Sequence, residues 1–530
     1  MSRATSRVEH LRAHALEQLA CPPAAEPQLL QGRAWLATAG ELWTVIRRGR
    51  VTAAILGGLT PVIDDGELLA GKFCRRSLTP DETAELAAFK SVAEPAMAPV
   101  LGQRAHMAID IEKLLRLGIR ELQRTIEGYR ARLDLARPAE LEQDAFYRAC
   151  LIALEAVCDY AQRYAELAAT LAAAEPDPAR RAELENLAAV CRRVPAFPAR
   201  TFHEAVQAVH FVNFCLCAGR RMLMFQFGRP DRYLLPFYRR DPSAGRLTPA
   251  DALELIDCLG IMLSEYTPRG LAVGWMLGGR DAAGADVCNE LTALFLDSIE
   301  RVRLSYPAVG LCWTPDTPRP IMAQVSRLLA AGLTHPALFN DDLISAGLME
   351  AGLPPAEACL YQHSTCVEIT PIASSNVYVP SPYVNLVQLL HDTLGLPPAV
   401  PATAPAAEPV VAAADRRPET FEALLAGYRR RLAAAVRQAV IEQNTIQATR
   451  RYNGGFPLLS CFVNDCLARG CDIDHGGARY NWIEPSFVGL SNLVDSLAAI
   501  RKFSMTKERS ALTSWCRPWG ATSPAARTCV

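Results

Sequence analysis

Short apolar segments alternate with helical segments in residues 271–369, and this alternation constrains the fold more than any other feature of the sequence. LAVGWMLGG (271–279) and AVGLCWTP (308–315) are apolar and end in turn residues, which is typical of buried strands. A helix around residues 322–332, a turn at FNDD (339–342) and a further helix, LISAGLMEAG, follow. Strands that are separated by helices predict an α/β core.

The chain before about residue 265 has the sequence pattern of helices, because apolar residues recur at helical spacing and helix-start signals are frequent. Five segments carry these features: residues 1–19, 111–133 and 146–173, a capping box from Thr201 to Glu204, and Thr248 before a proline at the first helical position. We therefore expect a helical N-terminal half that wraps the α/β core. The Ala- and Pro-rich run at residues 397–418 is expected to be a surface loop before a helix that starts at Thr420.

The composition argues against several functions. Lys and Arg (55) balance Asp and Glu (56), which gives no electrostatic reason to expect binding to nucleic acid or an anionic membrane. No apolar run is long enough to span a bilayer, and the first 19 residues lack the apolar core of a signal peptide. We predict a cytoplasmic protein whose seventeen cysteines are mostly buried thiols. Cys461, Cys466 and Cys471 recur at intervals of five, but they lack CxxC pairs or His partners, so no metal site is predicted.

The segment HSTCVEITP (363–371) places a thiol and a carboxylate two residues apart. In an extended segment such residues face the same way, so Cys366 and Glu368 would point into one cavity, and His363 would face away from Cys366. The thiol is then a nucleophile, a hydrogen-atom carrier or a structural residue. A neighbouring carboxylate raises the pKa of a thiol by like-charge repulsion, which disfavours thiolate chemistry but not the loss of a neutral hydrogen atom. The residues alone leave a structural cysteine open.

Longer stretches resemble the glycyl radical enzymes of the pyruvate formate-lyase family. The cysteine segment is similar to that family's Cys-Val-Glu active-site loop. Other segments follow in the family's order: PVIDDGELLAGKF, VPAFPARTFHEAVQAVHFVNF, FGRPDRYLLPFYRRD, LGGRDAAGADVCNELT, FNDDLISAGLMEAGL and GGARYNWIEPSFVGLSNLVDSLAAIRKF. Similarity that keeps this order along most of the chain is more specific than one short motif.

The resemblance implies a fold, a chemistry and partners. The fold would be a ten-stranded α/β barrel of the pyruvate formate-lyase type, surrounded by helices, in a domain of residues 1–507. Cys366 would become a thiyl radical that removes a hydrogen atom from the substrate, and Glu368 would act as general base. A radical S-adenosylmethionine activating enzyme would install the glycyl radical, and no metal or other bound cofactor is expected. The protein would be a homodimer that acts on a small molecule.

The C-terminal region departs from the family pattern. Family members carry a loop like Arg-Val-x-Gly-Tyr whose glycine stores the radical, and no glycine after Lys502 has that setting, Gly520 included. Residues 508–530, read in another frame, resemble the helix that the family places next, so we expect a truncation by a frameshift near Arg509. The chain would then be inactive alone, unless a small autonomous glycyl radical protein supplied the loop. The nucleotide sequence of the gene tests this expectation.

The sequence narrows the reaction only to a class. Thr365 precedes Cys366 where pyruvate formate-lyase has a second cysteine, which disfavours acyl transfer and favours a dehydratase or lyase acting on a small polar substrate. Four candidate substrate-binding residues are hydrogen-bonding groups after the loop or before a helix: Ser375, Asn376, Tyr378 and His106. The alternatives are acyl transfer like that of formate C-acetyltransferase, a non-catalytic remnant, and a hydrolase or transferase with Cys366 as nucleophile.

Overall fold

The computed structural model divides into two compact units, which are described one at a time. The first unit comprises Met1–Val379 and Thr449–Trp482, and the second comprises Pro380–Ala448 and Ile483–Val530. The structure describes residues 4–97, 107–219, 225–243, 245, 247–267, 273–364, 368–376, 383–396, 418–483 and 485–504.

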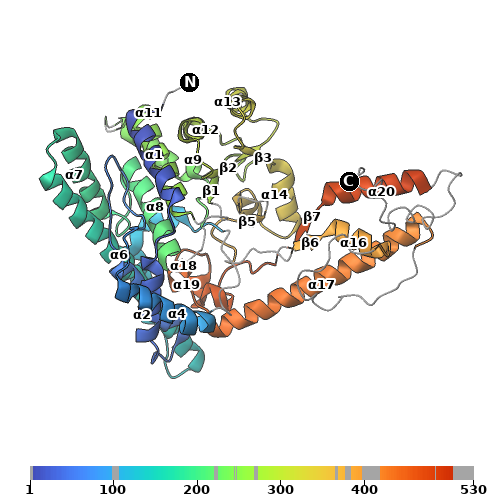
Figure 1. Cartoon of the computed structure of the whole chain (residues 1–530), viewed down its shortest axis with the longest axis horizontal. Helices are drawn as coiled ribbons and strands as arrows, with labels where there is room; N and C mark the ends of the chain where they lie inside the picture. Colours follow the sequence, from blue (N-terminus) through green and yellow to red (C-terminus); the bar gives the residue numbers. More distant parts are fainter. Residues whose placement is uncertain are drawn as a thin grey trace. The chain divides into compact units, whose positions relative to one another are not determined.

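Helices form the described part of the first unit as far as Tyr266, which confirms the predicted helical N-terminal half (Figure 1). They are α1 (Ser6–Ala20), α2 (Glu26–Ala37), α3 (Thr44–Gly58), α4 (Pro80–Met97), α5 (Ile111–Arg130), α6 (Pro138–Ala174), α7 (Pro178–Arg193), α8 (Phe202–Gly219), α9 (Pro230–Tyr233), α10 (Leu235–Ser243) and α11 (Pro249–Tyr266). Their apolar faces share one core, in which Leu56, Tyr164 and Phe211 are buried. Burial of this surface, rather than helix propensity, stabilises helices of this length.

Close packing inside α5 requires a glycine. Gly118 has a φ of +69°, and a Cβ atom at this position would lie 2.5 Å from the carbonyl carbon of Phe197. The segment after α7 therefore runs directly against the helix, and the Ile119 N–H donates to the carbonyl of Pro195 (2.9 Å).

Side-chain caps start two of the predicted helices. At α11, the Thr248 hydroxyl accepts from the Asp251 N–H (3.2 Å) and the Asp251 carboxylate accepts from the Thr248 N–H (2.9 Å), which is a complete capping box. At α8, the Thr201 hydroxyl accepts from the Glu204 N–H (3.1 Å), as predicted. The Glu204 carboxylate, however, accepts from the N–H of Arg200 (2.6 Å), one residue earlier than a capping box requires.

A three-stranded parallel sheet follows the N-terminal helices. Its strands β1 (Gly274–Gly278), β2 (Ala308–Trp313) and β3 (Ala337–Asn340) are joined by α12 (Glu290–Val302) and α13 (Arg319–Ala330), which confirms an α/β core. The prediction of a turn at FNDD is wrong. Its first two residues end β3, and its last two begin α14 (Asp341–Glu350), where the Asn340 side chain caps the Leu343 N–H (3.1 Å).

The rest of the first unit is built from short elements. After α15 (Pro355–Ala358), β4 (Tyr361–His363) and β5 (Ile369–Pro371) form an antiparallel pair. Later in the chain come α18 (Pro457–Ser460), α19 (Cys466–Arg469) and a 3₁₀ turn at Ile473–His475. The seven strands of the described residues belong to three separate sheets, so the α/β class is shown but a ten-stranded barrel is not.

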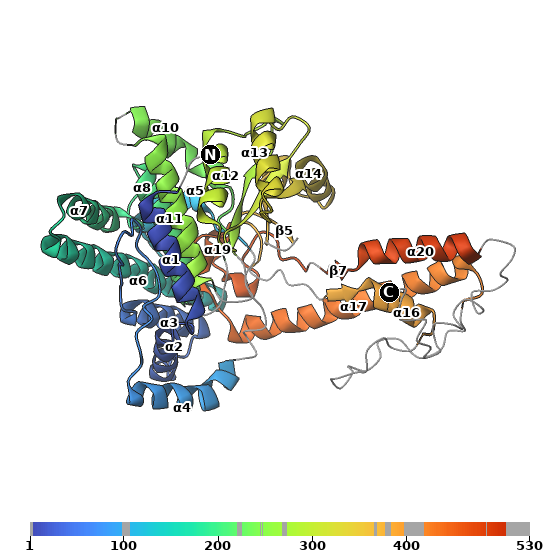
Figure 2. The same cartoon turned by 45° about the horizontal axis from the view of Figure 1, so that its top comes forward.

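The second unit has a small core of its own. Strands β6 (Tyr383–Asn385) and β7 (Ser486–Val488) pair in parallel, and α16 (Leu386–Thr393) and α20 (Leu490–Ser504) lie with them (Figure 2). The long helix α17 (Phe421–Asn453) starts in this unit, as predicted from Thr420, and its last residues belong to the first unit. Leu390, Leu424 and Leu493 are among the buried residues that hold these elements together. The expected surface loop, except residue 418, and the expected frameshifted tail lie outside the described residues.

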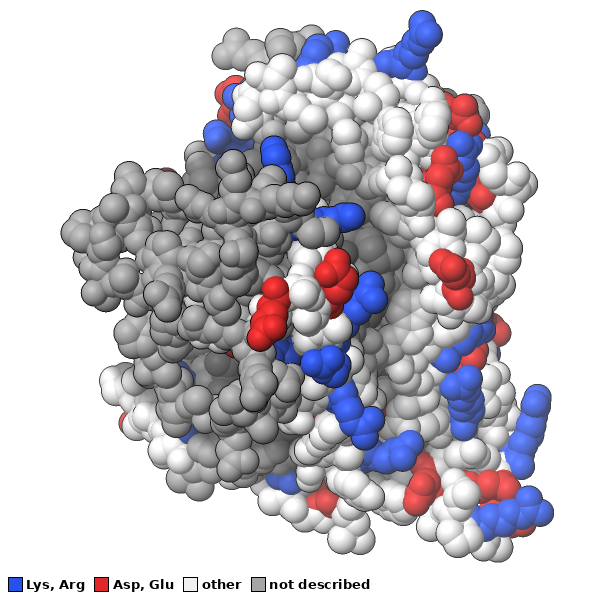
Figure 3. Space-filling model, turned by 90° about the vertical axis from the view of Figure 1, so that its right-hand side faces the viewer, with Lys and Arg blue, Asp and Glu red and all other residues white. Residues whose placement is uncertain are grey.

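Charged side chains of both signs are interspersed on the face drawn in Figure 3, in agreement with the balance of 55 basic and 56 acidic residues. Among the helices that the structure describes, none combines the length and the apolar composition needed to cross a bilayer.

A buried ammonium group organises the N-terminal segment PVIDDGELLAGKF. Lys72 is 4% exposed, and its Nζ donates to the carboxylates of Asp64 and Glu67 and lies 3.5 Å from that of Glu265. Burial raises the pKa of Glu67 to about 7, although Lys72 opposes this effect. The buried ammonium group of Lys72 thus compensates several acids at once.

Replacement of this cation should destabilise the fold. We expect Lys72→Met to lower the free energy of unfolding by about 3–5 kcal/mol, because carboxylates would be left buried without compensation. The loss of stability should be smaller at pH 5 than at pH 8. The folded-state pKa of Glu67 lies above its unfolded value, so the folded protein takes up a proton as the pH falls, and this proton neutralises a carboxylate that Lys72 no longer compensates. Urea unfolding at both pH values measures this. Arg33→Met, which removes an exposed ion pair with Glu85, is the control and should cost at most about 1 kcal/mol. Equal losses for both variants would contradict the prediction.

Candidate functional site

The predicted active-site segment forms a β-hairpin. Its strands β4 and β5 pair in the register Tyr361↔Pro371 and His363↔Ile369, and the Ser364 N–H donates to the carbonyl of Glu368 (2.9 Å). Thr365, Cys366 and Val367 lie outside the described residues. The hairpin therefore fixes both ends of the tip that carries Cys366.

This geometry changes one premise of the sequence analysis. The prediction that Cys366 and Glu368 share a face assumed one extended segment, whereas the chain reverses direction between Ser364 and Glu368. Strand alternation therefore does not relate these two side chains, because it applies only within a strand. Their common role stays a prediction that rests on the family resemblance.

Glu368 is a buried carboxylate with a hydroxyl donor beside it. It is 8% exposed, and the Ser364 hydroxyl, which is fully buried, donates to its Oε2. A hydroxyl that donates to a carboxylate stabilises the ionised form against the effect of burial. The carboxylate is thus held at the root of the tip.

His363 is held as a neutral imidazole. It is 3% exposed, its ring stacks on Phe339 with centroids 5.0 Å apart, and its backbone N–H donates to the sulfur of Met276 (3.1 Å). Burial lowers the pKa of His363 to about 4. At neutral pH this residue therefore carries no charge with which to stabilise a thiolate.

Arg229, the N-cap of α9, ties the hairpin to the parallel sheet. Its guanidinium is 2% exposed; Nε donates to the carbonyl of Tyr361 in β4 (3.0 Å), and Nη1 donates to that of Gly278 in β1 (2.8 Å). The Tyr361 ring lies 4.8 Å from the guanidinium carbon. Asp341, at the start of α14, supplies a carboxylate 3.9 Å from Nη2. One side chain thus joins four elements of the first unit.

Ser375 and Asn376 differ in their hydrogen bonds. Asn376 is held by backbone, because its Nδ2 donates to the Trp482 carbonyl (3.1 Å) and its Oδ1 accepts from the Trp482 N–H (3.2 Å). Ser375 bridges to Tyr480, and its hydroxyl is fully buried with no hydrogen-bond partner among the described residues. A buried hydroxyl without a protein partner is a candidate for binding water or a ligand.

The other two candidates, His106 and Tyr378, lie outside the described residues. A backbone hydrogen bond nevertheless connects the segment that follows His106 with the segment that precedes Ser375. The Ala373 N–H donates to the carbonyl of Ala108 (2.9 Å), so the backbone two residues after His106 is bonded to the backbone two residues before Ser375.

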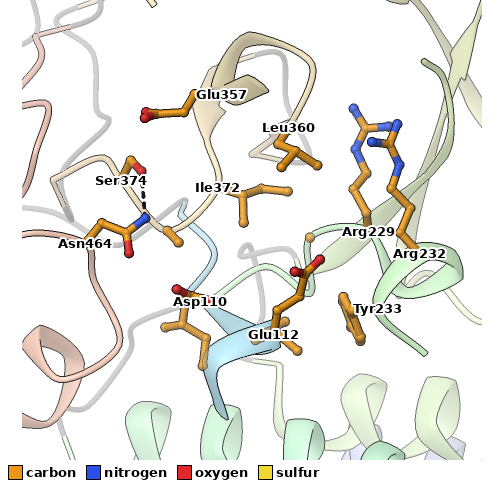
Figure 4. A pocket seen from close by; sticks show the side chains of 14 residues that line it. Asp110, Glu112, Arg229, Arg232, Tyr233, Glu357, Leu360, Ile372, Ser374 and Asn464 are labelled. Atoms are coloured by element: carbon orange, nitrogen blue, oxygen red, sulfur yellow. Dashed lines mark hydrogen bonds between the residues drawn. The ribbon is translucent and has the colours of Figure 1, made fainter. Parts of the chain in front are cut away.

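A cavity of about 220 Å³ lies at the base of the hairpin (Figure 4). Leu360 and Ile372, which flank the hairpin strands, form part of its wall. Arg229 and Arg232 lie side by side on one wall, and the Glu112 carboxylate points toward the centre (Figure 4). Burial, and then the charge of Asp110, raise the pKa of Glu112. Both arginines belong to the segment FGRPDRYLLPFYRRD, in which no sequence pattern marks them as part of a cavity.

Two of the three cysteines at five-residue intervals, Cys461 and Cys471, lie within hydrogen-bond distance of carbonyl oxygens. Cys461 is buried and donates to the carbonyl of Pro457 (3.2 Å), and Cys471 lies near the carbonyl of His475 (3.6 Å). Burial raises the pKa of Cys466. Among the residues that the structure describes, no group of three or more His, Cys, Asp or Glu side chains is placed to hold a metal ion.

A family model described as "Pyruvate formate lyase-like" matches residues 80–512. The chain therefore belongs to the pyruvate formate lyase-like family, which confirms the resemblance that the sequence carries. It spans about half the length of the curated relatives that it matches.

Two curated relatives illustrate the chemistry of the family. The isethionate sulfite-lyase of Oleidesulfovibrio alaskensis is 31% identical over 425 residues, which cover 74% of this chain and 49% of that protein. The (2S)-3-sulfopropanediol dehydratase of Klebsiella oxytoca is 28% identical over 417 residues, covering 76% and 50%.

Solved structures share the fold. A glycyl radical enzyme from Archaeoglobus fulgidus superposes with a TM-score of 0.80 at 27% identity, over 94% of this chain and 72% of that one. The B12-independent glycerol dehydratase of Clostridium butyricum gives a TM-score of 0.84 at 22% identity, over 97% and 73%.

Substitutions at two adjacent residues should separate a structural role from a ligand-binding one. We expect Asn376→Ala to lower the free energy of unfolding by about 1–3 kcal/mol, because it leaves the N–H and carbonyl of Trp482 without their partners. Ser375→Ala is the matched control and should change stability by less than about 0.5 kcal/mol, since its hydroxyl has no partner in the described part of the chain. Equilibrium unfolding in urea measures both. A large loss for Ser375→Ala would show that its hydroxyl is part of the folding core.

Proposed function

We propose that this chain is the catalytic part of a glycyl radical lyase or dehydratase, in which Cys366 works as a thiyl radical and Glu368 as a general base. The observation that carries this assignment is the buried carboxylate of Glu368 at the root of the tip that bears Cys366, in a chain of this family. Curated relatives named as lyases and dehydratases support the reaction class.

The residues have complementary roles in each step. The Cys366 sulfur takes a hydrogen atom from a substrate carbon that bears a hydroxyl or an amine, so a C–H bond breaks and an S–H bond forms. Glu368 accepts the proton of that hydroxyl or amine, and the electron density left on oxygen or nitrogen drives out a leaving group with its electron pair from the adjacent carbon. The product radical then takes the hydrogen atom back from Cys366. Atoms and electrons balance, and the thiyl radical is regenerated.

A glycyl radical supplies the oxidant that converts the Cys366 thiol to the thiyl radical. The source of this radical is a glycyl loop of the family type or a separate small glycyl radical protein, activated by a radical S-adenosylmethionine enzyme. Without that source the 530-residue chain is inactive, because its thiol stays closed-shell.

The substrate is a small polar molecule bound near the hairpin. The unpartnered, buried hydroxyl of Ser375 supports a direct contact with it. Asn376 contributes its remaining lone pair or holds the segment 480–482 in place. His106 and Tyr378 complete the binding set, and the backbone bond between Ala108 and Ala373 supports the inclusion of His106.

In this proposal the protein has the ten-stranded α/β barrel of the family, to which the strands of the sheets described above contribute, and it acts as a cytoplasmic homodimer. The fold similarity to solved family members supports this architecture.

Activation without air tests the proposed function. The chain is mixed with an autonomous glycyl radical protein and an activating enzyme, and is then supplied with isethionate, (2S)-3-sulfopropanediol or trans-4-hydroxy-L-proline, the substrates that the names of relatives indicate. We expect product from at least one. Cys366→Ser should abolish it, and Glu368→Gln should lower the rate by about 100-fold or more, the usual contribution of a general base.

Cys359→Ser is the matched control, because Cys359 is a buried thiol near the hairpin whose sulfur donates only weakly to a carbonyl (3.5 Å). It should keep most of the activity. Turnover by Cys366→Ser at the wild-type rate would overturn the assignment. Rapid inactivation of the aerobically purified chain by iodoacetamide at Cys366 would favour a nucleophilic thiolate instead.

A further inference from the structure

Ser364 and Glu368 are linked twice across the hairpin tip. The Ser364 N–H donates to the Glu368 carbonyl (2.9 Å), and the Ser364 hydroxyl donates to the Glu368 carboxylate. The backbone bond alone is sufficient to close the turn. The hydrogen bond from the Ser364 hydroxyl is a second contact, and it acts on the side-chain carboxylate of Glu368.

Burial makes this contact consequential. Ser364 is fully buried and Glu368 is 8% exposed, so water has little access to the carboxylate. A buried carboxylate tends to hold its proton, whereas a donated hydrogen bond favours the ionised form. A hydrogen bond to a charged group is also worth more than one between neutral groups.

The charged and titratable groups packed around the hairpin come from four elements. His363, the adjacent residue on β4, is neutral at pH 7 because burial lowers its pKa to about 4, although the charge of Glu368 opposes this effect. Arg229, from α9, donates to the carbonyls of Tyr361 and Gly278 and lies 3.9 Å from Asp341. His335, which precedes β3, also has a lowered pKa because of burial.

We infer that Ser364 is a positioning residue for Glu368: its hydroxyl fixes the orientation of the carboxylate and keeps it ionised, ready to accept a proton. This inference rests on the proposed function of Glu368 as the base. A serine hydroxyl both donates and accepts. Once Glu368 has taken the substrate proton, the Ser364 hydroxyl rotates and accepts a hydrogen bond from the protonated carboxyl. The substrate proton stays on the carboxyl group of Glu368 until it is released, and its release returns the base to the ionised form.

An infrared titration of the 530-residue chain tests the inference without any turnover. The difference spectrum between wild type and Glu368→Gln isolates the carboxyl signal of Glu368, and its intensity against pH gives the pKa. Ser364→Ala should raise this pKa by about one unit, since loss of a hydrogen bond to a charged group disfavours ionisation. Ser364→Thr keeps a hydroxyl and should leave the pKa within about half a unit of wild type.

Ser364→Cys guards against a folding defect in Ser364→Ala, because its thiol is nearly isosteric but donates weakly; it should give an intermediate shift. An unchanged pKa in both Ser364→Ala and Ser364→Cys would overturn the inference and leave Ser364 with the backbone role alone. The infrared result is independent of the proposed function. If the shift is found but the activated enzyme shows no matching shift in the acidic limb of its pH–rate profile, the pairing stands and the role of Glu368 as base fails.

Discussion

The buried guanidinium of Arg229 is the contact on which the site depends. It is 2% exposed and donates to carbonyls of both β4 and β1, so it holds the hairpin against the end of the parallel sheet. The fit is close, because a Cβ atom on Gly279 would lie 3.1 Å from Nη1. A planar group with several fixed donors can bridge two strands in this way, and a lysine cannot. The two strands that precede and follow Cys366 in the chain are thereby held by the sheet.

The electrostatics around the hairpin favour one-electron chemistry at sulfur. A buried carboxylate lies at the root of the tip, and the nearest histidine is neutral at pH 7. A thiolate in such surroundings would be destabilised by the acid and would receive no help from an imidazolium. Removal of a hydrogen atom leaves sulfur neutral and avoids this cost. The same carboxylate accepts a hydrogen bond from the Ser364 hydroxyl, which agrees with its proposed role as proton acceptor.

Much of the fold could be predicted from local signals. The strands β1 and β2 are apolar runs between turn residues, and α8 and α11 begin at hydroxyl caps, so short windows of sequence suffice. Strand β3 was missed because Asn340, Asp341 and Asp342 read as a turn, although the first of them ends a strand and caps a helix. The sequence predicts one extended segment in place of the hairpin, because strands of three residues are too short for periodicity to reveal. Arg229 carried no signal at all, since its hydrogen bonds go to backbone carbonyls that no sequence pattern marks.

Electron paramagnetic resonance of the activated complex, recorded without air before and after addition of a turned-over substrate, tests the central claim most directly. If Cys366 relays the radical, the substrate will alter the organic radical signal of the wild-type complex, and Cys366→Ser will form the initial signal but show no change on substrate addition. An identical substrate-induced change in the Cys366→Ser complex would contradict the account, because the substrate would then lose its hydrogen atom without this sulfur.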